Sequence, residues 1–460
     1  MKNNKYLFAV FLSALIVRLL FLWITNPKPE LWITPENQMY ISIADGIIDM
    51  GEFVHKHGPP LKYIQETERL PGYPLYLVLY FVVFGSSLIW PLIGQIILGS
   101  VTCVVIGLIV EEFHENTFII GGMLAAFNLN LINHDTLILA DSLLMFFFTI
   151  HLYHTIQLLK NPNYGRAGFS GFFLGLAVMT KPVVIYWVPI IAIFISIIFI
   201  VRLKRFVPAV IYGAMILIGP SLLTSPHYLR NYSIYGSWEL VSQTGTHLMN
   251  WVVPLTKEYN TGKPWSESVA EINITLKEEV QRQGLEKLPE NPFHASKLMQ
   301  EVALIELKSM GLWAITYAWT VGSFINLMTP STASLGFIDR MERPRFYKTK
   351  GSNILIKIIN FLFHPDNRIY LIFLLPSFFL LLLIRLFFMI GLINLFNNAS
   401  KLHLTILALL LSGYIFAVTG PVVGGARFRL PIEPVLITVT TVGLINSYCY
   451  WKTRQQSNDL

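Results

Sequence analysis

Residues 6–24 read YLFAVFLSALIVRLLFLWI, an apolar run broken by one charged side chain, Arg18. A helix needs about 20 such residues to cross the hydrocarbon core of a bilayer, where backbone groups find no water to bond. Similar runs recur along all 460 residues, of which 54% are hydrophobic and only 13% are charged, and the mean hydropathy is +0.56. The runs are too long for the strands of a membrane barrel. The chain is therefore predicted to be an all-α polytopic membrane protein.

Ten crossings are expected from the lengths of these runs. The run at 71–84 is left out, because it is short, starts at a proline and ends before Gly85, as an interfacial or re-entrant helix would. Residues 312–328 are apolar enough to lie in the interface or to span the membrane. The expected crossings are residues 6–24, 88–110, 117–132, 136–159, 167–179, 183–201, 206–224, 369–396, 402–420 and 432–450.

Lysine and arginine residues set the expected orientation. Two lysines lie in residues 1–5, and positive charge beside a crossing favours the cytoplasmic side. If the run at 71–84 does not cross, the basic clusters at 160–166 and 202–205 also face the cytoplasm. Both ends of the chain then lie inside, and the loop at 25–87 faces outward.

Three regions are expected from this map. Residues 1–224 form a seven-span core that includes the first outer loop, 25–87, with its interfacial helices. Residues 225–366 are mostly polar and form an extracytoplasmic, mainly helical domain, part of which lies in the membrane interface. Residues 367–460 form a module of three crossings.

Cysteine content and charge limit the partners. Cys103 and Cys449 lie in separate crossings, so no disulfide is expected in the outer domain. The net charge of +7 is spread over loops on both sides, which favours anionic membrane lipids over nucleic acid as a partner. The first crossing is too long for a cleavable signal and is predicted to remain as an anchor.

Two polar positions inside or beside crossings leave alternatives open. Arg18 could snorkel to the outer interface, or it could orient the loop that carries Glu36 or a lipid headgroup. His134 stands beside Asp135, but no second histidine lies at the spacing of a metal site. We therefore expect His134 to mark a polar end of a crossing.

Five short motifs follow one another along the chain. The first links Glu36, four residues before Tyr40, with RLPGYP at 69–74. The others are LADSL at 139–143, GFFLGLAVMTKP at 171–182, RNY at 230–232 and ARFRLPIEP at 426–434. In this order they resemble the glycosyltransferase C superfamily. The resemblance is to the family 39-like branch, with the protein O-mannosyltransferases and the lipid A aminoarabinose transferase, which typically has aspartate in place of Glu36.

The resemblance implies a membrane enzyme that transfers one sugar from a polyprenyl monophosphate to a lipid, glycan or protein acceptor. It also implies a bacterial inner membrane location, with the active site facing the periplasm or the cell exterior. Two other classes fit the composition. A secondary transporter would place its polar residues near the middle of the membrane, and a polyprenyl-linked glycan ligase or polymerase would use a lipid diphosphate donor.

The resemblance also implies roles for the acidic residues. Glu36 is the candidate base that takes the proton of the acceptor hydroxyl. Either it reaches further than the family's aspartate, or Glu66 or Glu68 shares the work. Asp141 holds the acceptor or sugar hydroxyls, or it joins Glu36 around a magnesium or manganese ion, since members of the superfamily differ in their use of metal.

A leaving lipid phosphate needs fixed cations, and arginine suits this role because its planar fork bonds phosphate oxygens in pairs. The candidates for binding the donor phosphate are Arg69, Lys181, Arg230, Arg427 and Arg429. The other expected substrate-binding residues are all from the first loop: Tyr40, Tyr73, Glu66 and Glu68.

Overall fold

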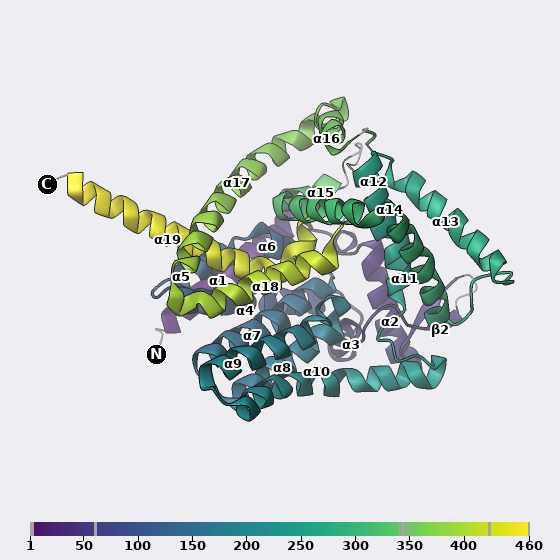
Figure 1. The fold of residues 1–460 in the computed structure, drawn as a ribbon, viewed down its shortest axis with the longest axis horizontal. Coiled ribbons are helices and arrows are strands. Elements are labelled where there is room, and N and C mark those ends of the chain that lie inside the picture. The colour runs from purple at the N-terminus through teal and green to yellow at the C-terminus, as the bar shows by residue number, and fades with distance from the viewer. Residues whose placement is uncertain are drawn as a thin grey trace.

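A computed structural model of the chain describes residues 4–58, 62–339, 341, 346, 349–351, 353–421 and 425–458. Long helices lie side by side, with both termini on the same side of the molecule (Figure 1). Eight helical segments of the described residues are long and apolar enough to cross a membrane, which confirms the polytopic class. They are Asn4–Thr25, Ile89–Phe113, Ala140–Lys160, Pro182–Leu203, Phe206–Tyr235, Pro365–Phe396, Ala399–Thr419 and Ala426–Gln456.

Two of the ten expected crossings differ from this set. The segment at 117–132 is two short helices, α5 (Phe118–Ala126) and α6 (Leu129–Asp135), rather than one. The break occurs because the side chain of Asn128 accepts the first backbone N–H groups of α6, at 2.9 and 3.1 Å, as an N-cap does. The segment at 167–179 is α8 (Tyr164–Thr180), whose 17 residues reach roughly 26 Å, less than the core of a typical bilayer.

The first loop is more than interfacial helices. It contains α2 (Pro35–Met50), the short apolar helix α3 (Gly72–Phe84), and between them a hairpin that the sequence did not predict. The hairpin pairs β1 (Val54–His57) with β2 (Lys62–Gln65) in antiparallel register. At 13 residues, α3 is too short to cross a bilayer, in agreement with the expectation for 71–84.

The stretch expected to form the outer domain is mainly helical, as predicted. Its helices are α11 (Gln243–His247), α12 (Val253–Thr261), α13 (Trp265–Arg282), α14 (Pro292–Met328), α15 (Gly336–Asp339) and α16 (Ile354–Leu362). Gly311 kinks α14 with a φ of 82°, so the run at 312–328 is the second half of a bent helix. The expected boundary at 224 falls inside α10 (Phe206–Tyr235), and the division into three regions stays a prediction.

Helices α8 and α10 approach closely at two glycines. A Cβ on Gly171 would lie 2.4 Å from the carbonyl oxygen of Ile216, and one on Gly175 would lie 2.8 Å from that of Gly219. Glycine lets the two backbones touch. The glycine-rich motif therefore has a packing role in the core that α7 (Ala140–Lys160), α8, α9 (Trp187–Leu203) and α10 share.

The two ends of the bundle carry different groups. Helix α7 begins beside Asp141 and ends at Lys160, which pairs with Glu112. At this second end Arg202 donates a hydrogen bond to the carbonyl oxygen of Leu159. The expected basic clusters thus gather at the end of the bundle opposite Asp141.

Candidate active site

One buried carboxylate, Asp141, joins three distant parts of the chain. Its side chain is 4% exposed and lies in the first turn of α7. Lys181 Nζ lies 2.9 Å from Oδ1. Arg427, on the 3₁₀ helix Ala426–Ile432, donates to Oδ2 through Nη2 at 2.8 Å and Nε at 3.2 Å. Three candidate residues thus meet, although 286 positions separate Arg427 from Asp141.

The local sequence explains why the side chains of Lys181 and Asp141 can meet. Pro182 disfavours a helical conformation at Lys181, so α8 ends before Lys181, which is extended with φ −154° and ψ 130°. Asp141 stands at the N-terminus of α7, where the helix dipole favours a negative charge. The extended backbone at Lys181 lets its side chain turn back to that helix end.

The first loop packs against the end of α8, next to Lys181. A Cβ on Gly72, the first residue of α3, would lie 2.6 Å from the carbonyl oxygen of Met179 and 2.9 Å from the amide of Thr180. Only glycine permits so close a contact. It brings the turn that carries Arg69 to the end of α8, where Lys181 follows.

Arg69 has unused donors in this turn. Its Nε and Nη1 atoms are buried and have no hydrogen-bond partner in the part of the chain that the structure describes. Glu68 Oε2 lies 3.6 Å from Nη1, too far for a hydrogen bond. The guanidinium carbon lies 6.0 Å from the centre of the Tyr40 ring. Buried charged donors without partners are costly, so a bound anion is a fitting partner for Arg69.

Glu66 shapes the turn that presents Arg69. Its Oε1 accepts the backbone N–H groups of Glu68 at 2.6 Å and Arg69 at 2.8 Å, and its Oε2 lies 2.9 Å from His55 Nδ1. Burial raises the pKa of Glu66, but the hydrogen bonds from His55 and the two amides outweigh it and hold the pKa below its usual value. Both oxygens are engaged in organising the loop.

The side chains of Tyr40 and Tyr73 are buried and pack against each other. Tyr73 is fully buried and its hydroxyl donates to Gln95 Oε1 at 2.5 Å. The Gln95 amide in turn donates to the carbonyl oxygen of Leu137 at 2.8 Å. The Tyr40 ring meets Tyr73 edge to face at 5.1 Å. Sequence reasoning did not single out Gln95, although a glutamine in an apolar run was the available signal.

Glu36 lies in the first turn of α2, and its side chain is outside the part of the chain that the structure describes. Its assignment as the base stays a prediction. Among the described side chains, no group of three His, Cys, Asp or Glu residues could hold a metal ion. Since the expected site would include Glu36, the magnesium or manganese alternative stays a prediction as well.

Arg230 belongs to a different contact. Its Nη2 donates to the carbonyl oxygen of Phe53 at 3.1 Å and to Gln65 Oε1 at 2.6 Å. The guanidinium carbon lies 5.3 Å from the centre of the Phe53 ring. Arg230 thus fastens the hairpin to α10, and these contacts do not join it to Asp141.

Arg429 is also separate from Asp141. It is 3% exposed, and its Nε donates to Glu433 Oε1 at 3.0 Å. Its Nη1 donates to the carbonyl oxygens of Asn326 at 2.9 Å and Thr329 at 2.6 Å, which would otherwise be unpaired at the end of α14. The described contacts of Arg429 are structural, and its expected role at the donor phosphate is untested.

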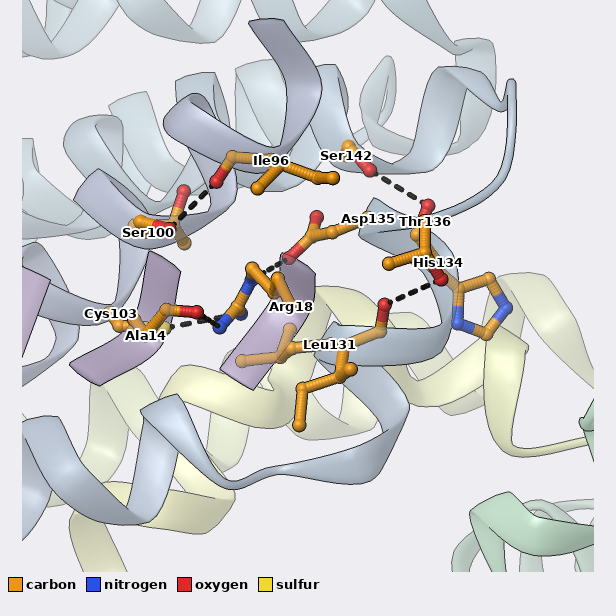
Figure 2. A network of polar contacts seen from close by, with 12 residues as sticks. Ala14, Arg18, Ile96, Ser100, Cys103, Leu131, His134, Asp135, Thr136 and Ser142 are labelled. Carbon is orange, nitrogen blue, oxygen red and sulfur yellow. Dashed lines mark hydrogen bonds and ion pairs between the residues drawn. The ribbon is translucent and has the colours of Figure 1, made fainter. Parts of the chain in front are cut away.

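The two expectations for Arg18 were wrong. Its side chain is 0% exposed and does not reach the surface. Figure 2 shows it inside the bundle, where Nε donates to Asp135 Oδ2 at 2.7 Å and Nη2 contacts Cys103 Sγ at 3.2 Å. A charge held inside an apolar bundle needs a partner, and Asp135, far away in sequence, supplies it.

His134 is held by its backbone surroundings, in agreement with the expectation of a polar helix end. Its Nδ1 lies 2.7 Å from the carbonyl oxygen of Asn130, so Nδ1 carries the proton. The carbonyl oxygen of His134 accepts the hydroxyl of Ser142 at 2.9 Å (Figure 2). These bonds tie α6 to the start of α7, next to Asp141.

Comparison with protein families gives a partial match. Residues 68–226 match a family model described as dolichyl-phosphate-mannose-protein mannosyltransferase. The matched stretch contains Arg69, Asp141 and Lys181. A search of the curated proteins finds no match.

Comparison with solved structures extends over the whole chain. The archaeal oligosaccharyltransferase AglB from Archaeoglobus fulgidus, in complex with an inhibitory peptide and a dolichol-phosphate, has a TM-score of 0.55 at 13% identity, covering 100% of this chain and 52% of that chain. ArnT from Cupriavidus metallidurans, bound to undecaprenyl phosphate, has a TM-score of 0.38 at 12% identity, covering 96% and 77%. The chain thus spans about half the length of AglB. The family match and the AglB fold confirm the resemblance to the glycosyltransferase C superfamily.

Proposed function

Because the chain has the glycosyltransferase C fold and a partial match to a mannosyltransferase family, we propose that it transfers a monosaccharide from a polyprenyl-phosphate donor. The acceptor is a lipid, a glycan or a protein on the extracytoplasmic face of the membrane. The observation that carries the proposal is the buried Asp141 with its two cations, Lys181 and Arg427. The dolichol-phosphate in the AglB complex supports a polyprenyl phosphate as the lipid.

The cluster suits a phosphate monoanion or dianion. Asp141 cancels one of the two positive charges and fixes both cations in place. The side chains of Lys181 and Arg427 are 24% and 25% exposed, so part of each faces outward. Arg69 adds a third positive charge from the neighbouring turn. Donors that are already in position stabilise developing charge without reorganisation, which is what a leaving phosphate requires.

The reaction then proceeds as one displacement. The acceptor oxygen forms a bond to the anomeric carbon while the bond from that carbon to the phosphate oxygen breaks. The electron pair of the broken bond leaves with the polyprenyl phosphate, whose charge Lys181, Arg427 and Arg69 balance. The proton of the acceptor hydroxyl passes to the carboxylate of Glu36.

The charge distribution supports the proposed side of the membrane. Arg202 lies at the end of the bundle opposite Asp141 and near Lys160. Basic residues beside crossings favour the cytoplasm. The end that carries Asp141 then faces the periplasm or the cell exterior.

Mass spectrometry of envelope lipids, glycans and proteins tests the function without prior choice of sugar. Cells with the wild-type chain should show products heavier by one monosaccharide. Glu36→Gln should lower their formation by about 10²–10⁴-fold, since general-base catalysis contributes this much. Glu30→Gln, at an exposed glutamate of the same loop, is the matched control and should behave like wild type.

The outcomes separate the base from the enzyme. Full product in Glu36→Gln would remove the base assignment and leave the transferase in place. Unchanged products in cells that lack the chain, together with a lost solute flux, would overturn the transferase in favour of a transporter.

A further inference from the structure

Helix α16 (Ile354–Leu362) keeps its charge inside the protein. Lys357 is 2% exposed and forms an ion pair with Glu258 of α12, which is 3% exposed. The other polar side chain of the helix, Asn360, donates to the carbonyl oxygen of Lys350 at 3.0 Å. Lys357 is therefore satisfied inside the protein, whereas Asn360 is exposed and bonds to the protein through its amide nitrogen.

The outward side of α16 is apolar. Leu355, Ile359 and Phe363 are 68%, 53% and 82% exposed. They follow one another at intervals of four residues, so they form one stripe along the helix. A helix that faces water has the opposite arrangement, with charges outside and apolar residues inside. The inverted pattern of α16 indicates an apolar medium outside the protein.

The next element shows what that medium is. The turn His364–Asn367 leads from α16 directly into α17 (Arg368–Phe396), one of the eight potential crossings. Only 11% of the apolar window of α17 is buried in the described structure, as is expected of a crossing whose other faces contact lipid. Figure 1 shows α16 at the beginning of this helix. The stripe is therefore continuous with a lipid-facing surface.

A second exposed apolar feature, the corner formed by Leu312 and Trp313 of α14, lies beside a hydrogen bond to α12. Just past the kink at Gly311, Leu312 and Trp313 are 80% and 81% exposed. Asn260 of α12 donates to the carbonyl oxygen of Ala314 at 2.9 Å. With Phe363, these two are the most exposed large apolar side chains of the described residues. Tryptophan is enriched where proteins meet the membrane interface.

We propose that the stripe Leu355–Ile359–Phe363 and the corner Leu312–Trp313 insert into the lipid bilayer surface, at the end of the bundle that carries Asp141. The end is assigned because the first part of α17 lies near the 3₁₀ helix that carries Arg427: Ser377 of α17 hydrogen-bonds to Thr332 at 2.6 Å. The neighbouring Ser331 accepts from Arg429 at 3.3 Å. The Glu258–Lys357 pair then fastens α12 to a lipid anchor. The proposed lipid contact of this surface does not rest on the proposed sugar transfer.

Fluorescence quenching in vesicles tests the lipid contact. Cys449 is exposed and Cys103 is buried, so Cys449→Ser gives a background for single labels. Leu355→Cys, Ile359→Cys and Phe363→Cys, each in the full-length chain, carry an environment-sensitive fluorophore. Vesicles of phosphatidylcholine with and without brominated acyl chains report contact with lipid, and iodide reports contact with water. Lys287→Cys, where the side chain is 74% exposed, is the aqueous control.

We expect the brominated chains to quench the three stripe labels several-fold more than the label at 287, and iodide to quench them less. If iodide reaches the stripe labels as readily as the label at 287, the stripe faces water and the proposal fails. If both quenchers fail to reach them, a second copy of the chain covers the stripe, and the proposal also fails.

Discussion

The chain contains two buried carboxylates only six residues apart, Asp135 and Asp141, and each is paired with basic side chains. They differ in what surrounds the cation. Arg18, the partner of Asp135, is 0% exposed, whereas Lys181 and Arg427, the partners of Asp141, are 24% and 25% exposed. A pair enclosed on all sides can only hold helices together. A pair whose cations reach the surface can also bind a ligand.

The enclosed pair has a space made for it. A Cβ on Gly99 of α4 (Ile89–Phe113) would lie 2.2 Å from Asp135 Oδ2. Glycine therefore makes room for the carboxylate, and the pair joins α1 (Asn4–Thr25), α4 and α6 (Figure 2). At the open site, the partners of Asp141 come from the end of α8 and from the 3₁₀ helix Ala426–Ile432 instead, and both are partly exposed.

Asp135→Asn should have the largest effect on stability. We expect the free energy of unfolding to fall by about 3–5 kcal/mol, because Arg18 would keep a buried charge without its partner. Unfolding of the purified protein in detergent measures the change. The double variant Arg18→Met with Asp135→Leu removes both charges and should recover much of the loss. Wild-type stability in Asp135→Asn would show that the enclosed pair does not hold the bundle.

Asp141→Asn should act mainly on activity. We expect sugar transfer to fall by about 10²–10³-fold, as when one preorganised group is lost from a site. The free energy of unfolding should change less than in Asp135→Asn, because Lys181 and Arg427 can turn toward water. Transfer assays and unfolding of the same preparation measure both. Equal destabilisation by the two variants would erase the distinction between the pairs.

The contrast between a partly exposed site and an enclosed ion pair recurs at Arg427 and Arg429, which lie two residues apart. Arg427→Gln should lower transfer by about 10–100-fold, since a hydrogen bond to a charged group contributes about 1.5–3 kcal/mol. Arg429→Gln should instead lower the free energy of unfolding by a similar amount, because the carbonyl groups at the end of α14 lose their donor. The apparent KM for the donor and the unfolding midpoint separate the two. The reverse assignment of effects would place Arg429, not Arg427, at the donor.

Glu66 should show the smallest effect, as a function of pH. Its pKa in the folded protein lies below the usual value of 4.5. The carboxylate therefore stabilises the turn above that pH, and the contribution is lost as the pH falls through the lower folded value. The protection of the amides of Glu68 and Arg69 against hydrogen exchange, relative to the intrinsic rate at each pH, should fall below about pH 4.5.

Two variants serve as comparisons for this pH dependence. In Glu66→Gln the two amides should show low protection at every pH, because an amide oxygen is a weaker acceptor than a carboxylate. Glu68→Gln, at the neighbouring carboxylate whose side chain is 47% exposed, is the matched control and should keep the wild-type pH dependence. A pH-independent turn in the wild-type chain would contradict the role given to Glu66.

Much of the helix map could be predicted because the length of an apolar run is a local property. The prediction was wrong at 117–132, where Asn128 starts a new helix through a hydrogen bond that apolarity does not reveal. It also omitted the hairpin of β1 and β2, whose alternation is only four residues long in each strand. Short elements with few apolar residues give weak periodic signals.

The candidate site was predicted in part. Asp141, Lys181 and Arg427 were named from motifs and meet in space, and Arg69 lies in the turn beside them. The motifs could not separate these from Arg230 and Arg429, because the residue types are the same. The partners that separate them, a hairpin and the end of α14, lie far away in the sequence.

The sequence by itself determined that this chain is a membrane protein. It also determined the positions of most of the long helices and the polar residues that were candidates for chemistry. These follow from composition and from spacing along the chain, which are local. Only the tertiary structure decided that Arg18 is buried in an ion pair with Asp135, that Arg429 bonds the carbonyl groups at the end of a helix, and that Asp141 pairs with two partly exposed cations. The reason is physical: the energy of a buried charge depends on its partners and its exposure, and both are set by segments that fold together from distant positions.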